Sequence, residues 1–412
     1  MHDPKKIQDL VDHNMKHEFF SKFYEGRPVI DSYDAFLKLP TMRKRSLLEH
    51  FGSASLRFTD DTVYARSTSG TSESMAIVYY TELDDKKNLE RFQSQMSYMH
   101  DTDRVLVLWP PGIDHIFTMH LRSSGATVAI GNCFDLAYSA KLAREMEADT
   151  LCITPALCIK IGELLRDYQG IHKIILGGSG VSGMVREKLQ ELFPGASIIM
   201  TYGLAETGKS LYQCPKLYGT NLYHTFDDDF LYEILKYDED SPCSSGEEGE
   251  LTFTKLWYPS GLPLIRYRTG DTAIISGRCG CGKDTLMITG RTGDDSFKLK
   301  GLTFYNEDFE NILSQFKERI YGDFRVHIHE VARDDLPVPF LEVEISCKDR
   351  RPDLRESIQD KLNSSLMISA DYSWKEGVDL GIFCPIEVRL VDEIPGAKTK
   401  KIIDHRISEN SR

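Results

Sequence analysis

Residues 202–207 read Tyr-Gly-Leu-Ala-Glu-Thr, and they lie where the pattern of the chain changes. Before them, short apolar runs alternate with helical stretches, and the last of these runs is 197–200. After them, from about Phe230, strand-like runs follow one another with turn signals such as Ser-Ser-Gly between them. Alternation predicts a parallel sheet covered by helices, whereas consecutive strands predict antiparallel pairing. We therefore expect a parallel part before this stretch and a β-rich, barrel-like part after it.

The predicted elements divide the chain into two domains. Strands of the parallel part are expected at 104–109, 126–130, 149–153, 173–176 and 197–200, with helices at 139–147 and 182–192. Strands of the β-rich part are expected at 230–236, 250–255, 264–267 and 272–276. After Gly301, helices are expected at 307–316 and 353–366, and strands at 324–330, 339–346 and 386–390. The sequence thus predicts an α/β fold with a large N-terminal domain, residues 1–293, and a small α+β C-terminal domain, residues 294–412.

Composition excludes several classes of protein. The chain has 412 residues, 41% of them hydrophobic, and a net charge of −13, which argues against a general binder of nucleic acids or anionic membranes. No apolar run approaches the roughly 20 residues of a membrane span, and the first 20 residues lack the apolar core of a signal peptide. We expect a cytoplasmic protein that binds neither nucleic acids nor membranes.

Nine cysteines are present, an odd number that favours reduced thiols over a disulfide framework. Cys279 and Cys281 are one residue apart, so a disulfide between them would be strained. The pair is therefore either two idle thiols or half of a metal site.

Several different short polar motifs lie along the chain. Residues 67–73 are rich in Ser, Thr and Gly, residue types whose hydroxyls and closely approached amides suit a phosphate. Residues 177–180 read Gly-Gly-Ser-Gly between a strand and a helix. Further motifs are Tyr-Arg-Thr-Gly-Asp at 267–271, Gly-Arg-Thr-Gly-Asp-Asp at 290–295 and Ala-Lys-Thr-Lys-Lys at 397–401. Each alone is typical of a turn, a cap or a solvated tail.

Taken together, in this order and at these spacings, the motifs resemble those of the adenylate-forming acyl-CoA synthetase superfamily, and within it most closely the phenylacetate–CoA ligase-like group. The resemblance extends from about Tyr64 to Arg406. Its most specific parts are 202–207, 267–271 and the stretch 224–234, His-Thr-Phe-Asp-Asp-Asp-Phe-Leu-Tyr-Glu-Ile. It implies ATP, Mg²⁺ and coenzyme A as cofactors and a C-terminal domain that moves.

The resemblance implies a nucleotide site built from three of these motifs. The β- and γ-phosphates of ATP would be cradled by Ser67, Thr68, Ser69, Gly70, Thr71 and Ser72. The adenine slot would be lined by Gly178, Ser179 and Gly180. Tyr202, with Gly203 beside it, would stack on the purine.

Polar side chains would hold the rest of the nucleotide. Glu206 would bind Mg²⁺ and Thr207 the α-phosphate, in keeping with the preference of a hard cation for carboxylate. Asp271 would accept hydrogen bonds from both ribose hydroxyls, assisted by Arg291.

Asp294 would be the hinge of the C-terminal domain, and Lys398 its mobile catalytic lysine. The chain departs from the family pattern at Glu73 and Ser74, where a Gly and often a Lys are usual, and at Ala397, where Gly usually precedes the lysine. A carboxylate beside a polyphosphate is unfavourable unless it points away or reaches a metal, so altered pyrophosphate handling is open.

The resemblance also answers the question of the paired cysteines. In this group a cysteine and a histidine after the first motif meet a later Cys-x-Cys at a structural zinc ion, and Cys214, His224, Cys279 and Cys281 stand at the matching places. Three thiolates and one imidazole satisfy tetrahedral Zn²⁺ completely, as in closed structural sites.

The implied activity is the activation of a carboxylic acid, aryl or arylacetic by the subgroup resemblance, as an acyl adenylate and its transfer to coenzyme A. Two alternatives stay open: an adenylating ligase with a carrier-protein thiol or an amine as acceptor, and a nucleotide-binding homologue with weakened catalysis. Trp109 and Phe117 fit either a substrate pocket or the core, the core being favoured. A homodimer is also open.

Overall fold

The computed structural model of the protein describes residues 3–68, 76–110, 113–178, 180–181, 183–237, 239–291, 296–300, 302–333, 336–347, 350–368, 372–394 and 402–408. The chain divides into two compact units, Met1–Gly180 with Leu192–Thr289, and Val181–Glu191 with Gly290–Arg412. Among the helices that are described, none has the length and apolar character needed to cross a membrane. The predicted division between residues 293 and 294, with a mobile C-terminal domain, stays a prediction.

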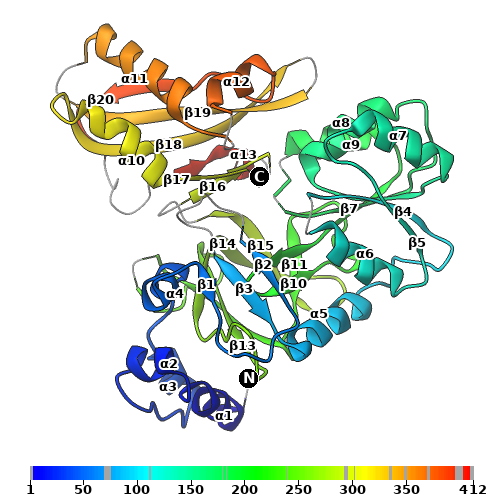
Figure 1. The fold of residues 1–412 in the computed structure, drawn as a ribbon, viewed down its shortest axis with the longest axis vertical. Helices are drawn as coiled ribbons and strands as arrows, with labels where there is room; N and C mark the ends of the chain where they lie inside the picture. Colours follow the sequence, from blue (N-terminus) through cyan, green and yellow to red (C-terminus); the bar gives the residue numbers. More distant parts are fainter. Residues whose placement is uncertain are drawn as a thin grey trace. The chain divides into compact units, whose positions relative to one another are not determined.

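The first unit contains a parallel sheet of five strands in the order β5-β4-β6-β7-β8. Its strands are β4 (Arg104–Leu108), β5 (Thr127–Ile130), β6 (Thr150–Ile153), β7 (Lys173–Leu176) and β8 (Ser197–Met200). Figure 1 shows α6 (Asp114–Arg122) on one side of this sheet and α7 (Leu136–Glu145) and α8 (Pro155–Leu164) on the other. Because helices cover both faces, the strands are almost continuously apolar. The predicted parallel sheet is confirmed.

The helix predicted at 139–147 begins three residues earlier, at Leu136. Asp135 explains the difference, since its carboxylate accepts a hydrogen bond from the backbone N–H of Tyr138 and so caps the helix. Helix α9 (Gly183–Leu192) matches its prediction to within one residue.

An antiparallel sheet of seven strands follows, in the order β12-β13-β14-β15-β11-β10-β9. Its strands are β9 (Tyr202–Leu204), β10 (Gly208–Tyr212), β11 (Leu222–Thr225), β12 (Phe230–Leu235), β13 (Gly249–Lys255), β14 (Tyr267–Arg278) and β15 (Asp284–Arg291). The predicted antiparallel pairing is confirmed. The prediction of separate strands at 264–267 and 272–276 is wrong, because β14 runs unbroken through the residues that were expected to form a turn.

The N-terminal residues of the first unit form short helices and a small sheet in the order β1-β3-β2. The helices are α1 (Pro4–Asn14), α2 (Glu18–Phe23), α3 (Tyr33–Leu37), α4 (Lys44–Phe51) and α5 (Glu82–Ser94), and the strands are β1 (Ser55–Leu56), β2 (Tyr64–Ser67) and β3 (Ile77–Tyr80). Buried side chains such as Phe20, Phe36 and Met42 pack with Leu264 and Ile265 in one apolar core.

The second unit contains a four-stranded sheet in the order β20-β19-β18-β21. Its strands are β18 (Ile320–Arg333), β19 (Leu336–Cys347), β20 (Glu387–Val391) and β21 (Ile402–Asp404), and a hairpin of β16 (Ser296–Leu299) and β17 (Leu302–Tyr305) precedes it. The helices are α10 (Asn306–Leu313), α11 (Pro352–Ser365), α12 (Trp374–Asp379) and α13 (His405–Ser408). Figure 1 shows α11 and α12 beside β19 and β20, and Leu354, Ile358 and Leu362 of α11 enter the core. The predicted α+β character is confirmed, whereas β21 was not expected.

Candidate functional site

The structure brings together two predicted nucleotide residues from motifs far apart in the sequence. The hydroxyl of Tyr202 donates a hydrogen bond to Asp271 Oδ2 at 2.5 Å, across 69 residues of chain. Tyr202 begins β9, and Asp271 lies in β14. Asp271 is buried, whereas Tyr202 and its neighbour Gly203 are partly or fully exposed. An aromatic ring and a carboxylate thus lie side by side.

A bulge in β14 aims the Asp271 side chain. The pairing with β13 runs in one register at Gly249↔Ala273 and in another at Thr252↔Arg268, with a shift between them. Between these registers three β14 residues, 269–271, face the single β13 residue Leu251, and Gly270 in their middle has φ +76°, a left-handed conformation that glycine adopts without strain. Thr269 Oγ1 then accepts a hydrogen bond from the Asp271 N–H at 3.0 Å. This bulge replaces the turn that the sequence had suggested.

Glu206 lies in the tight connection between β9 and β10 and is 9% exposed. Tyr267, the first residue of β14, donates a hydrogen bond to Glu206 Oε1 at 3.3 Å. The hydroxyl of Tyr80 donates to the carbonyl of the preceding residue, Ala205. Two tyrosines from other strands therefore hold this connection and its carboxylate in place.

Thr207 is turned inward in this structure. Its hydroxyl accepts a hydrogen bond from the Leu204 N–H at 3.3 Å and lies 3.0 Å from Gly208 O and 3.1 Å from Ser210 Oγ. The side chain is 2% exposed. Its contact with the α-phosphate stays a prediction.

Arg91 is a buried residue that motif reading did not find. It lies on α5, and its guanidinium donates to the carbonyls of Thr207 at 3.3 Å and Lys209 at 2.7 Å. A third bond runs to Asp229 Oδ2 at 2.9 Å. Because both carbonyls closely follow Glu206, at the start of β10, Arg91 fixes the point where the connection that carries Glu206 enters that strand. The only signal in the sequence was Asp229, which lies within the stretch 224–234.

Near the start of the predicted phosphate loop, the structure describes the contacts of Thr68. Its N–H donates to Ala76 O at 2.8 Å, and its hydroxyl accepts from Ala76 N at 3.0 Å. Lys44, the first residue of α4, donates from Nζ to the same hydroxyl at 2.7 Å. Ser67 ends β2 next to Thr68. A cation from another element thus lies at the base of a loop that lacks the usual lysine.

Gly178 ends the segment that follows β7, with φ +83°. A Cβ atom there would lie 3.1 Å from the indole ring of Trp109, closer than a side chain is normally tolerated. Trp109 is 6% exposed and stacks on Phe117 with ring centroids 4.6 Å apart. The expectation that Trp109 and Phe117 are core residues is confirmed for Trp109. Gly180 is two residues further along the chain and is the last residue of the segment Met1–Gly180 of the first unit.

The remaining predicted site residues are described only in part or not at all. Ser69, Gly70, Thr71, Ser72, Ser179, Asp294 and Lys398 lie outside the described residues. Arg291 is the last residue of β15. Their roles stay predictions.

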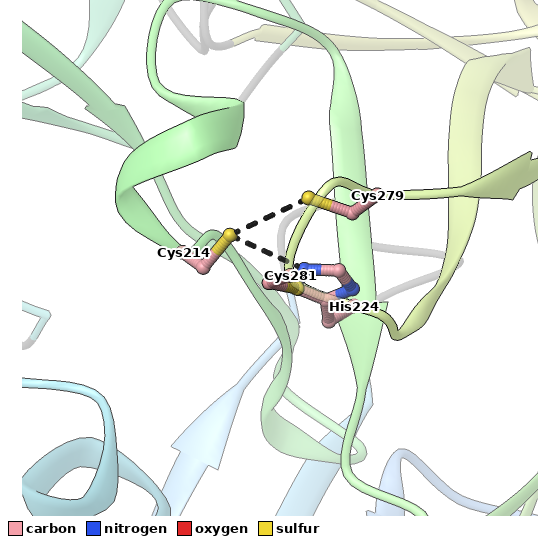
Figure 2. Close-up of side chains that lie close together, drawn as sticks. All are labelled: Cys214, His224, Cys279 and Cys281. Carbon is pink, nitrogen blue, oxygen red and sulfur yellow. Dashed lines mark hydrogen bonds between the residues drawn. The ribbon is translucent and has the colours of Figure 1, made fainter.

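The four predicted zinc ligands meet at one point, as Figure 2 shows. Their ligand atoms all lie within 4.8 Å of one another. Cys214 Sγ is 3.7 Å from Cys279 Sγ and 3.4 Å from His224 Nε2, and Cys281 Sγ is 3.3 Å from the same nitrogen. Tetrahedral Zn²⁺ bonds of about 2.3 Å to sulfur and 2.0–2.1 Å to nitrogen imply edges of roughly 3.8 Å and 3.6 Å. The donor set therefore fits the ion in chemistry and in size.

Local structure prepares these ligands. His224 lies in β11, and its Nδ1 is 2.8 Å from the carbonyl of Asp284, which can only accept, so Nδ1 carries the proton and Nε2 is left for a metal. Cys279 and Cys281 lie in the turn between β14 and β15. The Lys283 N–H lowers the pKa of the Cys281 thiol, whereas burial raises that of Cys214. Of the other cysteines, Cys152, Cys158, Cys347 and Cys384 are buried.

Two curated proteins match the sequence over most of its length. The phenylacetate-coenzyme A ligase of Escherichia coli (strain K12) is 24% identical over 357 residues, which are 81% of this chain and 80% of that ligase. The phenylacetate-coenzyme A ligase of Thermus thermophilus is also 24% identical over 357 residues, 81% of this chain and 76% of that ligase. No protein-family model matches the sequence.

Among solved structures, a 2-hydroxyisobutyryl-CoA ligase in complex with 2-HIB-AMP and CoA is similar in fold. The two structures superpose with a TM-score of 0.70 at 18% identity, over 97% of this chain and 88% of that one. The fold is therefore that of the adenylate-forming CoA ligases. The resemblance to that superfamily, and within it to the phenylacetate–CoA ligase-like group, is confirmed.

Proposed function

We propose that the protein is an AMP-forming acid–thiol ligase, which activates a carboxylic acid with ATP and transfers the acyl group to coenzyme A. The observation that carries the proposal is the contact between Tyr202 and Asp271 beside the buried Glu206, all within one compact unit. An aromatic ring, an acceptor for a diol and a carboxylate suited to a cation are the three groups a magnesium nucleotide needs.

The reaction has two steps because oxide is too poor a leaving group for a thiol to displace from a carboxylate. In the first, the substrate carboxylate attacks the α-phosphate of ATP; an acyl–phosphate bond forms and pyrophosphate leaves. In the second, the thiol of coenzyme A attacks the acyl carbonyl; a thioester forms and AMP leaves. Phosphoryl displacement depends on positioning and charge neutralisation. Asp271 would orient the ribose, and Glu206 would hold Mg²⁺, which offsets phosphate charge when bound.

The acid we propose is an aryl or arylacetic acid, since the curated relatives bear the name phenylacetate-coenzyme A ligase. Two other acceptors, a carrier-protein thiol and an amine, are distinguished by omitting coenzyme A from the assay. A binding protein with weakened catalysis is distinguished by carboxylate-dependent exchange of labelled pyrophosphate into ATP. A panel of carboxylic acids in that exchange assay tests the substrate proposal, and no exchange with any aryl acid would refute it.

We further propose that Cys214, His224, Cys279 and Cys281 hold a structural Zn²⁺. The fit of their spacing to a tetrahedron supports this role, and all four positions are taken by protein, which leaves no place for substrate.

Removing the carboxylate of Asp271 is expected to weaken ATP binding. In Asp271→Ala the ribose hydroxyls lose an ionised acceptor, a loss of about 1.5–3 kcal/mol that corresponds to about 10–150-fold in Kd. Calorimetric titration with ATP and Mg²⁺ measures it. Asp61→Ala, at an exposed position of the same unit, is the control and should bind ATP like the wild type. An unchanged Kd in Asp271→Ala would contradict the assignment.

Glu206→Gln should raise the Mg²⁺ concentration needed for half-maximal pyrophosphate exchange while leaving the Kd of metal-free nucleotide unchanged. The amide keeps the size of the side chain and can still accept from Tyr267, but it has lost the charge that a hard cation prefers. Equal Mg²⁺ requirements in the two proteins would exclude Glu206 as the ligand.

Cys281→Ser is expected to remove about one equivalent of zinc per chain, measured by elemental analysis. Unfolding with and without a strong chelator tests the structural role: zinc held at about 1,000 times its Kd contributes about 4 kcal/mol to the free energy of unfolding. Cys243→Ser, at a partly exposed thiol outside the cluster, should keep both metal and stability. Retention of the full zinc content by a Cys279→Ser/Cys281→Ser double variant would refute the site.

A further inference from the structure

Three histidines of the second unit form a cluster that neither the nucleotide site nor the cysteine site uses. His327 and His329 are two residues apart on β18, so their side chains point to the same face of the sheet. His405 is the first residue of α13, directly after β21. The ligand nitrogens of the three residues all lie within 4.8 Å of one another.

Strand pairing brings these residues together from opposite ends of the unit. β21 lies parallel to β18 with His327 opposite Ile403 and Ile328 opposite Asp404, so the next residue, His405, comes beside His329. The ring centroids of His329 and His405 are 4.4 Å apart with an angle of 7° between the planes. Those of His327 and His405 are 5.2 Å apart at 12°. His405 therefore stacks with both strand histidines.

The nitrogens are spaced as metal ligands are. His327 Nδ1 lies 2.9 Å from His405 Nε2. Four-coordinate ligation by imidazole at 2.0–2.1 Å from Zn²⁺ implies nitrogen separations of roughly 3.3–3.4 Å. A shift of a few tenths of an ångström would thus convert a nitrogen-to-nitrogen hydrogen bond into two metal bonds.

The second ring nitrogen of His327, Nε2, faces a carboxylate, as the second nitrogen of a metal-ligating histidine commonly does. Its Nε2 is buried and makes no hydrogen bond within the described part of the chain, and it faces Glu344 Oε2 at 3.6 Å. Arg389 holds the other oxygen, Glu344 Oε1, at 2.8 Å. A ligating histidine commonly directs its second nitrogen at a carboxylate, which fixes the ring and raises its basicity.

We propose that His327, His329 and His405 bind a divalent transition-metal ion of the zinc class, with Glu344 as the residue that orients His327. Three imidazoles suit borderline ions rather than Mg²⁺ or Ca²⁺. The ion ties β21 and α13, near the C-terminal end of the chain, to the centre of the four-stranded sheet. This site is independent of the proposed ligase activity and is chemically distinct from the cysteine site, because it contains no sulfur.

The test is a Zn²⁺ titration of protein whose cysteine site has been filled with one equivalent, with a chromophoric chelator as competitor. Wild-type protein is expected to take up about one further equivalent. His405→Gln and His329→Gln should each bind this second equivalent at least about 100-fold more weakly, since loss of a second-shell partner alone costs about 10–100-fold. His172→Gln, at an exposed histidine of the first unit, should behave as the wild type.

A pair of variants distinguishes an effect of Glu344 on the orientation of His327 from a general loss of stability of the sheet. Glu344→Gln and Arg389→Gln both break the same ion pair, but only the first removes the carboxylate that faces His327 Nε2. The proposal requires about 10–100-fold weaker zinc binding in Glu344→Gln and near wild-type binding in Arg389→Gln, with far-UV circular dichroism showing that both are folded. No second equivalent in the wild type, or its retention in both histidine variants, overturns the proposal in favour of a metal-free histidine stack.

Discussion

Lys398→Ala is expected to slow acyl-adenylate formation by about 10²–10⁴-fold, the range for losing one positioned charge that stabilises the transition state. Thioester formation from a chemically prepared acyl adenylate should continue at the wild-type rate. The reason is geometric: a lysine on a domain that takes two positions can reach the α-phosphate in only one of them. Single-turnover assays of each half-reaction measure the two rates separately.

Neighbouring lysines supply the matched controls for this test. Lys400→Ala and Lys401→Ala remove the same charge within three residues of Lys398, and both should leave the two half-reactions within about twofold if they belong to a solvated basic segment. Asp294→Pro stiffens the proposed hinge; if it holds the adenylating arrangement, adenylate should accumulate while transfer to the thiol fails. If Lys398→Ala slows both half-reactions equally, or neither, the domain-alternation hypothesis is wrong.

Lys209→Met is expected to stabilise the protein at neutral pH by up to about 4–5 kcal/mol. Lys209 is 6% exposed on β10, and its ammonium, which lies 4.6 Å from the centre of the Phe92 ring, forms no ion pair with the described residues. Burial, and secondarily Arg91, lowers the pKa of Lys209 to about 7 from its ordinary value of 10.5. Each tenfold change in proton affinity corresponds to about 1.36 kcal/mol, which gives the size of the effect.

The dependence on pH has a definite sign. Above about pH 10.5 the amine is neutral in both states, so its burial has no electrostatic cost; as the pH falls toward 7, only the unfolded chain gains the proton, and the folded state loses stability. The advantage of Lys209→Met should therefore be largest at pH 7 and below and shrink by about 1.36 kcal/mol per pH interval of one above it. Urea unfolding of both proteins from pH 7 to 10 measures this difference, and a difference that does not change with pH would contradict it.

Lys255 offers the contrasting control. Burial lowers the pKa of Lys255 to about 8, but its Nζ donates to Leu262 O at 2.9 Å and to Ser260 Oγ at 3.2 Å. Its Nζ also lies 3.9 Å from the buried Asp84 Oδ1, so Lys255→Met leaves a carboxylate and two hydrogen-bond acceptors without their partner and should destabilise the protein by at least about 1–3 kcal/mol. Opposite signs for two buried lysines would show that polar partners, both hydrogen-bond acceptors and a carboxylate, rather than burial alone, decide the outcome.

Sequence patterns predicted the secondary-structure elements that have a local signal in the chain. They did not predict the elements that exist only through pairing with a distant strand. The five strands of the parallel sheet were predicted to within about one residue, because apolar runs buried on both faces are easily recognised. β21 was missed because a three-residue strand has no period of its own and exists through its pairing with β18. The turn expected at 267–271 is a bulge within β14, since one glycine with positive φ can serve either conformation.

The candidate site shows the same division. The motifs identified Tyr202 and Asp271, and the structure places them in contact, but Arg91 and Lys44 carry no local signal because they act from helices distant in sequence. The histidine cluster was also missed: the His-x-His pair on β18 is short, and His405 lies 76 residues beyond its second histidine. Only the fold of the second unit reveals that the three belong together.

The turn between β14 and β15 has a consequence for the lifetime of the protein. Arg278 and Lys283, both exposed, flank the paired cysteines, so this turn carries two cleavage sites for trypsin-like proteases next to the proposed zinc ligands. Such enzymes cut chain segments that can open away from the fold, at a rate set by how often they open. A zinc ion bound by Cys214, His224 and the two turn cysteines would keep the segment closed. Zinc supply would then govern not only the folding of this chain but how long each copy survives digestion.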